Sequence, residues 1–423
     1  MAKKIKVLTL SDHPMSPSGV GTQTRYMIEA LLETEEFQVR SLGGAIKHED
    51  YSPSMSERFG EDWVIHPVDG YGNQQLVRQF MAEWKPDIIW FMTDPRFYPW
   101  LWDMDNEVRA NVPMVYYHVW DNYPLPTYNR NFYNSNDLVV SISKVTDDIV
   151  KQVSPEVDSI YLPHAVHPEI FKPLSDEERA DYRTKALPPS AKDKFIFFWN
   201  NRNAKRKMSG SVLWWFNDFL KEVGYDKAML IMHTDPKDPH GQDLHAIINE
   251  LGLADPEHMS VMLSVDKYPP EVLGQVYSMV DCTINISDAE GFGLATLESL
   301  SAGTPVIVNM TGGLQEQVTD GEHWFGIGLE PASKAIIGSQ DVPWIYEDRV
   351  CKEDFINALK EMMNMPKEER EHMGRLGRKH VETNYDFDKF QKSWHIILKN
   401  LHEEHGSWEN RKKYSPWTCK EMK

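Results

Sequence analysis

The sequence predicts an α/β protein made of two doubly wound lobes that face a cleft. Its 423 residues exceed the usual size of one hydrophobic core and fit two domains of about 200 residues each. Short apolar runs alternate with longer helical patterns, which is typical of parallel sheets covered by helices. The alternation lapses in the Pro- and charge-rich stretch 173–192, and this lapse predicts the boundary between the lobes.

The amino-terminal lobe, residues 1–180, opens with a predicted strand in KIKVLTL and a predicted helix in TRYMIEALLET. Further strands are expected in FQVRSLGG, KPDIIWFM, VPMVYYHV and DLVVSIS. The lysines at the start precede an apolar run of only about four residues, which is shorter than the core of a signal peptide. We therefore expect this run to be a first strand.

The carboxyl-terminal lobe, residues 190–380, repeats the alternation. Its strands are expected in KFIFFWN, AMLIMHT, HMSVMLS, DCTINIS and TPVIVN, and its helices in SVLWWFNDFLKEV, DLHAIINELGL and PEVLGQVYSMV. A last helical segment, 381–423, carries an apolar stripe at helical spacing, formed by Phe387, Phe390, Trp394, Ile397 and Leu401. Such a stripe needs a surface to pack against.

Composition limits the classes of function. The net charge of −19 favours solubility and gives no general attraction to nucleic acid or to an anionic membrane. The three cysteines, Cys282, Cys351 and Cys419, form no Cys-x-x-Cys pair, so neither a disulfide framework nor a cysteine metal site is expected. No apolar run approaches the roughly 18 residues of a membrane span. We expect a protein of the reducing cytoplasm.

Two features of the first lobe can contact a ligand. Gly19 and Gly21 follow the first strand in SGVG, where backbone amides at a helix start attract an anion; a tight turn without a ligand explains them equally well. His118 ends a predicted strand, a position where α/β folds expose functional groups. A buried histidine with satisfied hydrogen bonds is the alternative. The second strand carries Arg40 and no acid, which argues against a nicotinamide dinucleotide.

Aromatic residues follow His118. Trp120, Asp121 and Tyr123 can contact an acceptor by stacking and hydrogen bonding, or they can belong to the packing of the lobe. Asp103 and Asp105 form an Asp-x-Asp pair, which binds a divalent metal in another architecture of sugar transferases. Their surroundings favour a solvated helix face, and no metal site is expected.

A basic loop follows the first strand of the second lobe. NNRNAKRKM presents Arg202, Lys205, Arg206 and Lys207 within a strongly acidic chain. Arginine forks and lysine ammonium groups both bind phosphate oxygens, so a diphosphate is the natural ligand. A solvated basic loop remains the alternative.

The stretch DAEGFGLATLESLSAGTPVIV contains two acids eight positions apart. Gly291 and Gly293 leave the amides at the start of the helix open to phosphate, and Glu298 lies about a turn into that helix. A carboxylate there suits ribose hydroxyls, while Glu290 lies on the preceding loop. A helix cap and a solvent-facing acid are the alternative, and a catalytic carboxylate pair of a retaining hydrolase is a second.

These residues together resemble a known family. EGFGLATLE followed by SAGTPVI is similar to the E-x7-E signature of the retaining glycosyltransferases of family four, which have the GT-B fold of two Rossmann-like lobes. Other segments match in the same order: SGVG, YYHVWD, LPHAVHPEIFKPL, the spacing from Arg202 to Lys207, VYSMVDCTINISDAEGFG and TGGLQEQVTDG. The resemblance covers most of the chain and implies transfer of a sugar from a nucleoside diphosphate to an acceptor hydroxyl.

The resemblance also implies a role for each matching residue. Arg202 and Lys207 would hold the diphosphate, with Gly19 and Gly21 opposite. Glu298 would bind the ribose, Glu290 and His118 would contact the transferred sugar, and amides of Gly291, Phe292, Gly293 and Leu294 would hold phosphate and sugar hydroxyls. The last helix would return to the first lobe. No cofactor or metal is implied, and the donor is a UDP-, GDP- or ADP-sugar.

The chain also departs from the family pattern. Asn201 and Met208 stand where glycines are usual, and His164–His167 replaces an asparagine-glycine-valine-aspartate segment. A glycan, a lipid-linked sugar, a small metabolite or a modified nucleic-acid base all remain possible acceptors. A nucleotide-sugar-binding scaffold without turnover, or an epimerase or phosphorylase of the same fold, is the alternative function.

Overall fold

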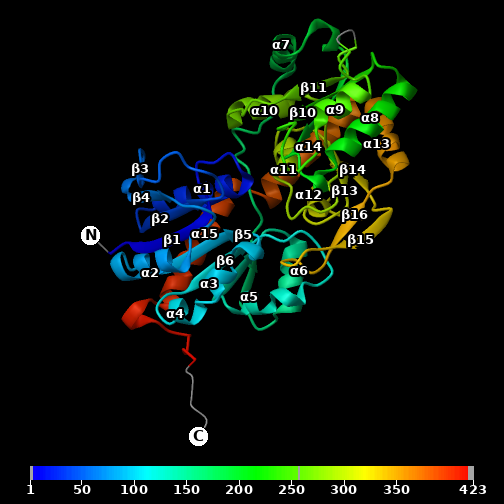
Figure 1. The fold of residues 1–423 in the computed structure, drawn as a ribbon. Coiled ribbons are helices and arrows are strands. Elements are labelled where there is room, and N and C mark those ends of the chain that lie inside the picture. The colour runs from blue at the N-terminus through cyan, green and yellow to red at the C-terminus, as the bar shows by residue number, and fades with distance from the viewer. Residues whose placement is uncertain (1–2, 256–257, 418–423) are drawn as a thin grey trace. The chain divides into compact units, whose positions relative to one another are not determined.

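The computed structural model describes residues 3–255 and 258–417 (Figure 1). The chain divides into two compact units. Unit 1 comprises residues 1–164, 338–344 and 388–423, and unit 2 comprises residues 165–337 and 345–387.

Unit 1 contains an eight-stranded sheet in the order β3-β4-β2-β1-β5-β6-β7-β8, parallel except at β3. Its strands are β1 (Ile5–Asp12), β2 (Phe37–Gly44), β3 (Ser54–Ser56), β4 (Gly60–Pro67), β5 (Ile88–Thr93), β6 (Met114–His118), β7 (Leu138–Ser141) and β8 (Ser159–Tyr161). Its helices are α1 (Gly19–Leu32), α2 (Gln74–Glu83), α3 (Pro99–Trp102), α4 (Asp105–Arg109), α5 (Arg130–Asn134), α6 (Lys144–Val153) and α15 (Phe387–His405). Every residue of the central strands β5 and β6 is buried, as expected for a sheet covered on both faces.

Unit 2 contains a six-stranded parallel sheet in the order β11-β10-β9-β12-β13-β14. Its strands are β9 (Phe195–Asn200), β10 (Ala228–His233), β11 (Val261–Ser264), β12 (Cys282–Asn285), β13 (Val306–Asn309) and β14 (Gly326–Leu329), with a separate hairpin of β15 (Ser333–Ile337) and β16 (Ile345–Arg349). Its helices are α7 (Asp176–Ala186), α8 (Ser209–Val223), α9 (Leu244–Glu250), α10 (Pro270–Met279), α11 (Leu294–Ser301), α12 (Leu314–Val318), α13 (Lys352–Asn364) and α14 (Lys367–Asn384).

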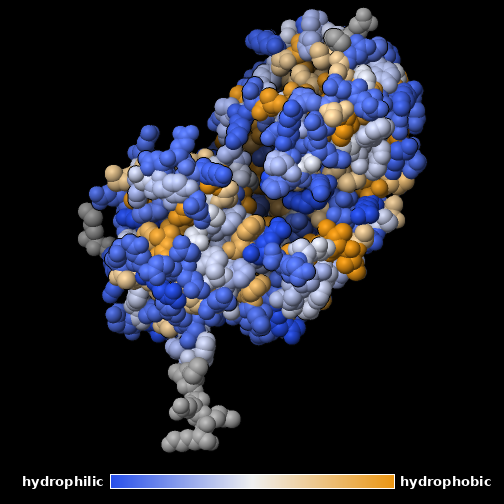
Figure 2. Space-filling view, in the orientation of Figure 1, coloured by the Kyte–Doolittle hydropathy of each residue, from blue (hydrophilic) through white to orange (hydrophobic). Residues whose placement is uncertain are grey.

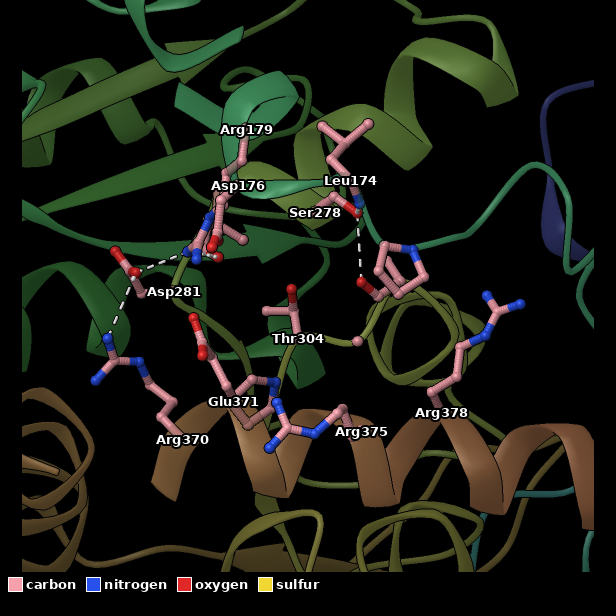
Figure 3. Close-up of a pocket in the computed structure, with 15 residues that line it drawn as sticks. Leu174, Asp176, Arg179, Ser278, Asp281, Thr304, Arg370, Glu371, Arg375 and Arg378 are labelled. Carbon is pink, nitrogen blue, oxygen red and sulfur yellow. Dashed lines mark hydrogen bonds and ion pairs between the residues drawn. The ribbon is translucent and has the colours of Figure 1, made fainter. Parts of the chain in front are cut away.

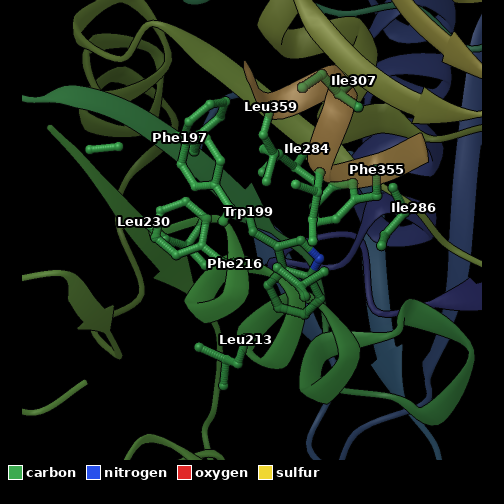
Figure 4. Close-up of a cluster of buried hydrophobic side chains, with 14 of the residues drawn as sticks. Phe197, Trp199, Leu213, Phe216, Leu230, Ile284, Ile286, Ile307, Phe355 and Leu359 are labelled. Atoms are coloured by element: carbon green, nitrogen blue, oxygen red, sulfur yellow. The ribbon is translucent and has the colours of Figure 1, made fainter. Parts of the chain in front are cut away.

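Two helical layers enclose the sheet of unit 2. Helices α8, α9 and α13 pack together on one side, and α10, α11 and α14 pack together on the other (Figure 1). The first layer closes a core in which Phe197 and Trp199 of β9 meet Phe216 of α8 and Phe355 of α13 (Figure 4). This doubly wound arrangement is the one predicted from the alternation of strands and helices.

The last helix, α15, belongs to unit 1. Trp394 is fully buried, and its ring meets the rings of Trp90 in β5 and Tyr117 in β6 edge to face, at centroid distances of 5.7 and 4.9 Å. Phe390 and Leu401 are also buried, whereas Ile397 is only half-buried and Leu398 takes its place in the core. The stripe from Phe390 to Leu401 thus packs against the sheet of unit 1, whereas Phe387 belongs to unit 2 and its ring lies near that of His167.

The lapse at 173–192 contains a helix that its composition did not predict. Helix α7 starts at a capping box in which Ser175 and Glu178 exchange hydrogen bonds with each other's backbone amides. No residue of α7 is buried, and its sequence has no apolar periodicity from which a helix could be predicted. Arg179 and Arg183 anchor α7 instead, by ion pairs with Asp281 at 2.8 and 2.6 Å.

The visible face of the molecule is mostly hydrophilic (Figure 2). Within residues 3–255 and 258–417, no helix is both long and apolar enough to cross a membrane. Cys282 is buried and Cys351 half-buried, and both are free thiols. Cys419 lies outside the described residues.

The packing of α15 predicts a large loss of stability on truncation of its central ring. Trp394→Ala removes a fully buried indole and should lower the free energy of unfolding of unit 1 by about 3–5 kcal/mol. Ile396→Ala on the exposed face of the same helix should change it by less than about 0.5 kcal/mol. Urea denaturation measures both values, and an equal effect of the two substitutions would contradict this packing.

Candidate active site

Three loops meet at the carboxyl ends of neighbouring strands in unit 2. The basic loop follows β9, the loop Ser287–Gly293 follows β12, and the loop Met310–Gly313 follows β13. Strands β9 and β12 are sheet neighbours, and the chain order reverses between them. Open α/β sheets bind ligands outside such a switch point, so the topology alone marks this edge as a candidate site.

A buried ion pair occupies this edge. Lys207 and Glu290 are each about 8% exposed, and the lysine ammonium group donates directly to Glu290 Oε2. Arg206 Nη1 lies 3.8 Å from the same oxygen and donates to Ala289 O at 2.6 Å. The Asp288 amide donates to Arg206 O at 2.8 Å, so backbone and side chains both join the two loops.

The environment of Glu290 keeps its carboxyl group ionised. Burial alone would raise the pKa of Glu290, but Lys207 and Arg206 outweigh burial and hold the pKa below its ordinary value. A buried carboxylate requires such compensation. The site therefore holds two cations around one anion.

The turn from β12 into α11 depends on glycine. Gly293 has φ +92°, and a Cβ there would lie 2.5 Å from Leu314 Cδ2. Gly293 is also the N-cap of α11, and no side chain of the described residues caps that helix start. The Gly313 amide donates to Glu290 O at 3.0 Å, which fixes the loop after β13 against the loop after β12.

The neighbouring residues of this turn have different surroundings. Phe292 is buried, its carbonyl accepts a hydrogen bond from Gln317 at 2.7 Å, and its ring packs near Tyr385. Gly291 is buried and Leu294, the first residue of α11, is half-buried. The predicted phosphate amides thus begin a helix whose first turn has backbone donors and no side-chain cap.

Glu298 lies further along α11 and has a separate set of partners. The Tyr277 hydroxyl donates to Glu298 Oε2 at 2.8 Å, and Asn200 Nδ2 donates to the Tyr277 hydroxyl at 2.7 Å. Burial raises the pKa of Glu298 to about 7, and the hydrogen bond from Tyr277 opposes this shift. Glu290 and Glu298 are therefore two acids in different environments, with different partners.

Arg202 lies apart from the buried pair. Its side chain is 61% exposed and donates to Asp238 at 2.7 Å, so the structure brings Lys207 and Arg206 to Glu290 and leaves Arg202 paired elsewhere. Its role towards a diphosphate stays a prediction. Met208, where the family usually has glycine, adopts the left-handed conformation at φ +60° and is the N-cap of α8.

The predicted residues of unit 1 lie at carboxyl ends of its own strands. Gly19 and Gly21 form the first turn of α1 after β1, where the Gly21 amide is capped by Ser18 Oγ at 3.0 Å. His118 ends β6 and is fully buried. Burial lowers the pKa of His118 to about 3, so the ring is neutral at physiological pH.

The hydrogen bonds of His118 orient its ring. The Tyr116 hydroxyl donates to Thr93 O at 2.7 Å, so His118 Nδ1, 3.2 Å away, is the donor to that hydroxyl. Nε2 is then the acceptor, and it has no hydrogen-bond partner within the described residues. A buried unpaired acceptor of this kind can accept a hydrogen bond from a ligand hydroxyl.

The acceptor-side aromatic residues are mostly engaged in packing. Trp120 is buried, donates to Asn122 O at 2.8 Å and packs near Tyr128. Tyr123 donates its hydroxyl to Asp148, and Asp121 is half-buried. Their contact with an acceptor stays a prediction.

Some residues of this site carry no recognisable signal in the sequence. Arg206 belongs to the predicted basic loop, but no signal in the sequence assigned it to Glu290. Asn200 and Tyr277 contact Glu298 only through the pairing of distant elements, β9 and α10. An asparagine at the carboxyl end of β9 was the one available signal.

Comparison with known proteins agrees with this architecture. A sucrose-phosphate synthase from Thermosynechococcus elongatus superposes with a TM-score of 0.74 at 16% identity, covering 95% of this chain and 100% of that one. Anabaena HepE in complex with UDP-glucose superposes with a TM-score of 0.67 at 15% identity, covering 94% and 100%. The two units are thus the Rossmann-like units of the GT-B fold, as predicted.

The family match lies in unit 2. Residues 242–380 match the model of the family described as glycosyl transferases group 1, which confirms the resemblance to glycosyltransferases. The D-inositol 3-phosphate glycosyltransferase of Acidothermus cellulolyticus is 38% identical over 93 residues, or 22% of this chain and 20% of that relative. The alignments with the curated relatives span less than half of their lengths.

The buried ion pair of Lys207 and Glu290 predicts that substitutions of the two residues have non-additive effects on the free energy of unfolding. Lys207→Met leaves the Glu290 carboxylate buried with only Arg206 near it, and should lower the free energy of unfolding by about 3 kcal/mol. Adding Glu290→Gln to this variant should restore most of the loss, because no buried charge is then left unpaired. Arg202→Gln, at an exposed position, is the control for charge removal in the same loop. Denaturant unfolding tests this, and additive losses would exclude a coupled pair.

Proposed function

We propose that this chain is a retaining glycosyltransferase that moves a sugar from a nucleoside diphosphate sugar to an acceptor hydroxyl. The observation that carries the proposal is the buried pair of Lys207 and Glu290, beside a glycine-dependent helix start at the switch point of unit 2. Positive charge and uncapped amides at that point suit a diphosphate. The family match over 242–380 supports the same class of reaction.

The proposed chemistry uses the charge around Glu290. The donor diphosphate would bind the amides at the start of α11 together with Lys207, Arg206 and Arg202. These groups would stabilise the negative charge that develops on the leaving phosphate when the sugar–oxygen bond breaks. The leaving phosphate would accept the proton of the acceptor hydroxyl on the same face of the sugar, so the configuration is retained. No enzyme nucleophile is required.

The two acids would take different roles. Glu290, held ionised by its cations, would contact the transferred sugar near its reacting face. Glu298, oriented by Tyr277, would accept hydrogen bonds from the ribose hydroxyls. A retaining hydrolase would need these acids as one pair, and their separate partners favour a transferase. In unit 1, His118 Nε2 would accept a hydrogen bond from a ligand hydroxyl.

A scaffold without turnover and an epimerase or phosphorylase are the remaining candidates. They share the donor site, so binding alone does not separate them from a transferase. We also propose that catalysis needs no metal, because side-chain cations neutralise the diphosphate. A cytoplasmic location fits the two free thiols, Cys282 and Cys351.

A donor panel tests the proposal. UDP-, GDP- and ADP-sugars are screened by thermal shift, and release of the nucleoside diphosphate is followed with and without candidate acceptors, in the presence of EDTA. We expect one nucleotide class to bind and its release to depend on acceptor. Lys207→Ala and Glu298→Ala should each weaken donor binding at least tenfold, since each removes a charge-assisted contact.

Each alternative function would give a different experimental result. Binding unchanged by both substitutions would refute the donor site. Release without acceptor would indicate a hydrolase, binding without release a scaffold, and a strict need for manganese would refute the metal-independent mechanism.

The raised pKa of Glu298 predicts a pH-dependent donor affinity. Its carboxylate forms as the pH rises through about 7, and the charged form accepts stronger hydrogen bonds from ribose than the neutral acid. Donor affinity should therefore increase about fivefold from pH 6 to pH 8. Calorimetry on the native chain and on Glu298→Gln separates this effect from titration of the ligand. The same pH dependence in both proteins would refute the assignment.

A further inference from the structure

A second pocket lies in unit 2, away from the candidate active site (Figure 3). Its volume is about 350 Å³, within the range of small-molecule pockets. Asp281 immediately precedes β12, and Thr304 and Pro305 immediately precede β13. The pocket therefore lies at the amino ends of strands whose carboxyl ends hold Glu290 and the loop after β13.

Arginine dominates the charged lining of this pocket. Four arginine side chains line the pocket, namely Arg179, Arg370, Arg375 and Arg378 (Figure 3). Asp281 carries one negative charge and faces three guanidinium groups, those of Arg179 at 2.8 Å, Arg183 at 2.6 Å and Arg370 at 3.9 Å. Positive charge thus exceeds negative charge around Asp281, within a chain of net charge −19.

The other acids of the lining already have basic partners. Lys367 lies 3.3 Å from Glu371 and 3.8 Å from Asp176. Arg378 is engaged too, since it donates to Ser301 O at 2.6 Å and pairs with Glu382 at 2.7 Å. The four acids named here, Asp176, Asp281, Glu371 and Glu382, face six bases, namely Lys367, Arg179, Arg183, Arg370, Arg375 and Arg378, so positive charge remains in excess.

Arg375 has no interaction partner within the part of the chain that the structure describes, and its side chain is exposed. Glu371, Gly374, Arg375 and Arg378 recur at the spacing of one helix face. A Cβ on Gly374 would lie 2.0 Å from Gly303 O, so the backbone of α14 packs directly on the loop that lines the pocket. This contact turns the face that carries Arg375 towards the pocket.

We propose that this pocket binds a small phosphorylated metabolite, with its phosphate held by Arg375 together with Arg370 and Arg179. Guanidinium forks match the oxygens of a phosphate, and its two charges suit the excess of arginine. A free phosphate ion would leave much of the 350 Å³ to water, whereas a phosphorylated molecule of sugar size would fill it. This site is separate from the proposed donor site and does not depend on the proposed function.

Calorimetric titration with inorganic phosphate, glucose 6-phosphate and glucose tests the proposal. We expect saturable binding of both phosphates and none of glucose. Arg375→Gln should weaken phosphate binding at least tenfold, and Arg375→Glu should abolish it, because each removes a charged contact of a side chain with no folding role. Tighter binding of glucose 6-phosphate than of phosphate would support a phosphorylated metabolite as the ligand.

Two control variants distinguish binding in this pocket from a general effect of charge and from binding elsewhere. Lys379→Gln removes one positive charge from an exposed position of the same helix, outside the pocket, and should change the affinity by less than twofold. Arg202→Gln reports binding at the basic loop instead. The proposal would be overturned if no saturable binding occurred, or if Lys379→Gln weakened binding as much as Arg375→Gln. It would also be overturned if binding were lost in Arg202→Gln alone. Thermal unfolding of each variant confirms that the fold is unchanged.

Discussion

A buried charge has to be compensated, and the candidate active site is organised by this constraint. Glu290 is almost inaccessible to water, so its carboxylate depends on Lys207 and Arg206. These cations come from the loop after β9, and Glu290 comes from the loop after β12. The ion pair therefore holds two loops of neighbouring strands together and concentrates positive charge where the chain order of the sheet reverses. A diphosphate that binds there would find its cations already in position.

The parallel sheet of unit 2 determines at which edge each charged loop lies. All six strands point the same way, so the loops with Lys207, Glu290 and Gly313 gather at one edge, and the loops with Asp281 and Thr304 gather at the other. Helix α11 runs between the two edges, from Gly293 to the wall of the second pocket. One short helix thus follows the loop that carries Glu290 and ends where Arg378 donates to Ser301 O.

Much of this fold follows from local patterns in the sequence. Apolar runs identified most of the buried strands of both sheets, because these strands are continuous apolar segments, as β9 and β5 show. The strands β3, β4, β8 and β14 were not predicted, and neither were helices α2 and α6. Helix α7 escaped prediction since it has no buried face and is anchored by ion pairs with Asp281. In the site, residue type and spacing selected Lys207 and Glu290, but the partners of Glu298 come from distant elements. Strand order, which brings β9 beside β12, is not encoded in any local pattern.

We propose that Glu290 holds Lys207 in the position in which the lysine binds the donor diphosphate. The most direct measurement is the affinity of the free nucleoside diphosphate, by calorimetry, for the native chain, Lys207→Met and Glu290→Gln. We expect Lys207→Met to weaken binding at least tenfold, whereas Glu290→Gln should preserve or tighten binding because the lysine loses its competing partner. Equal weakening by both substitutions, or no effect of Lys207→Met, would contradict this proposal and leave the pair with a structural role alone.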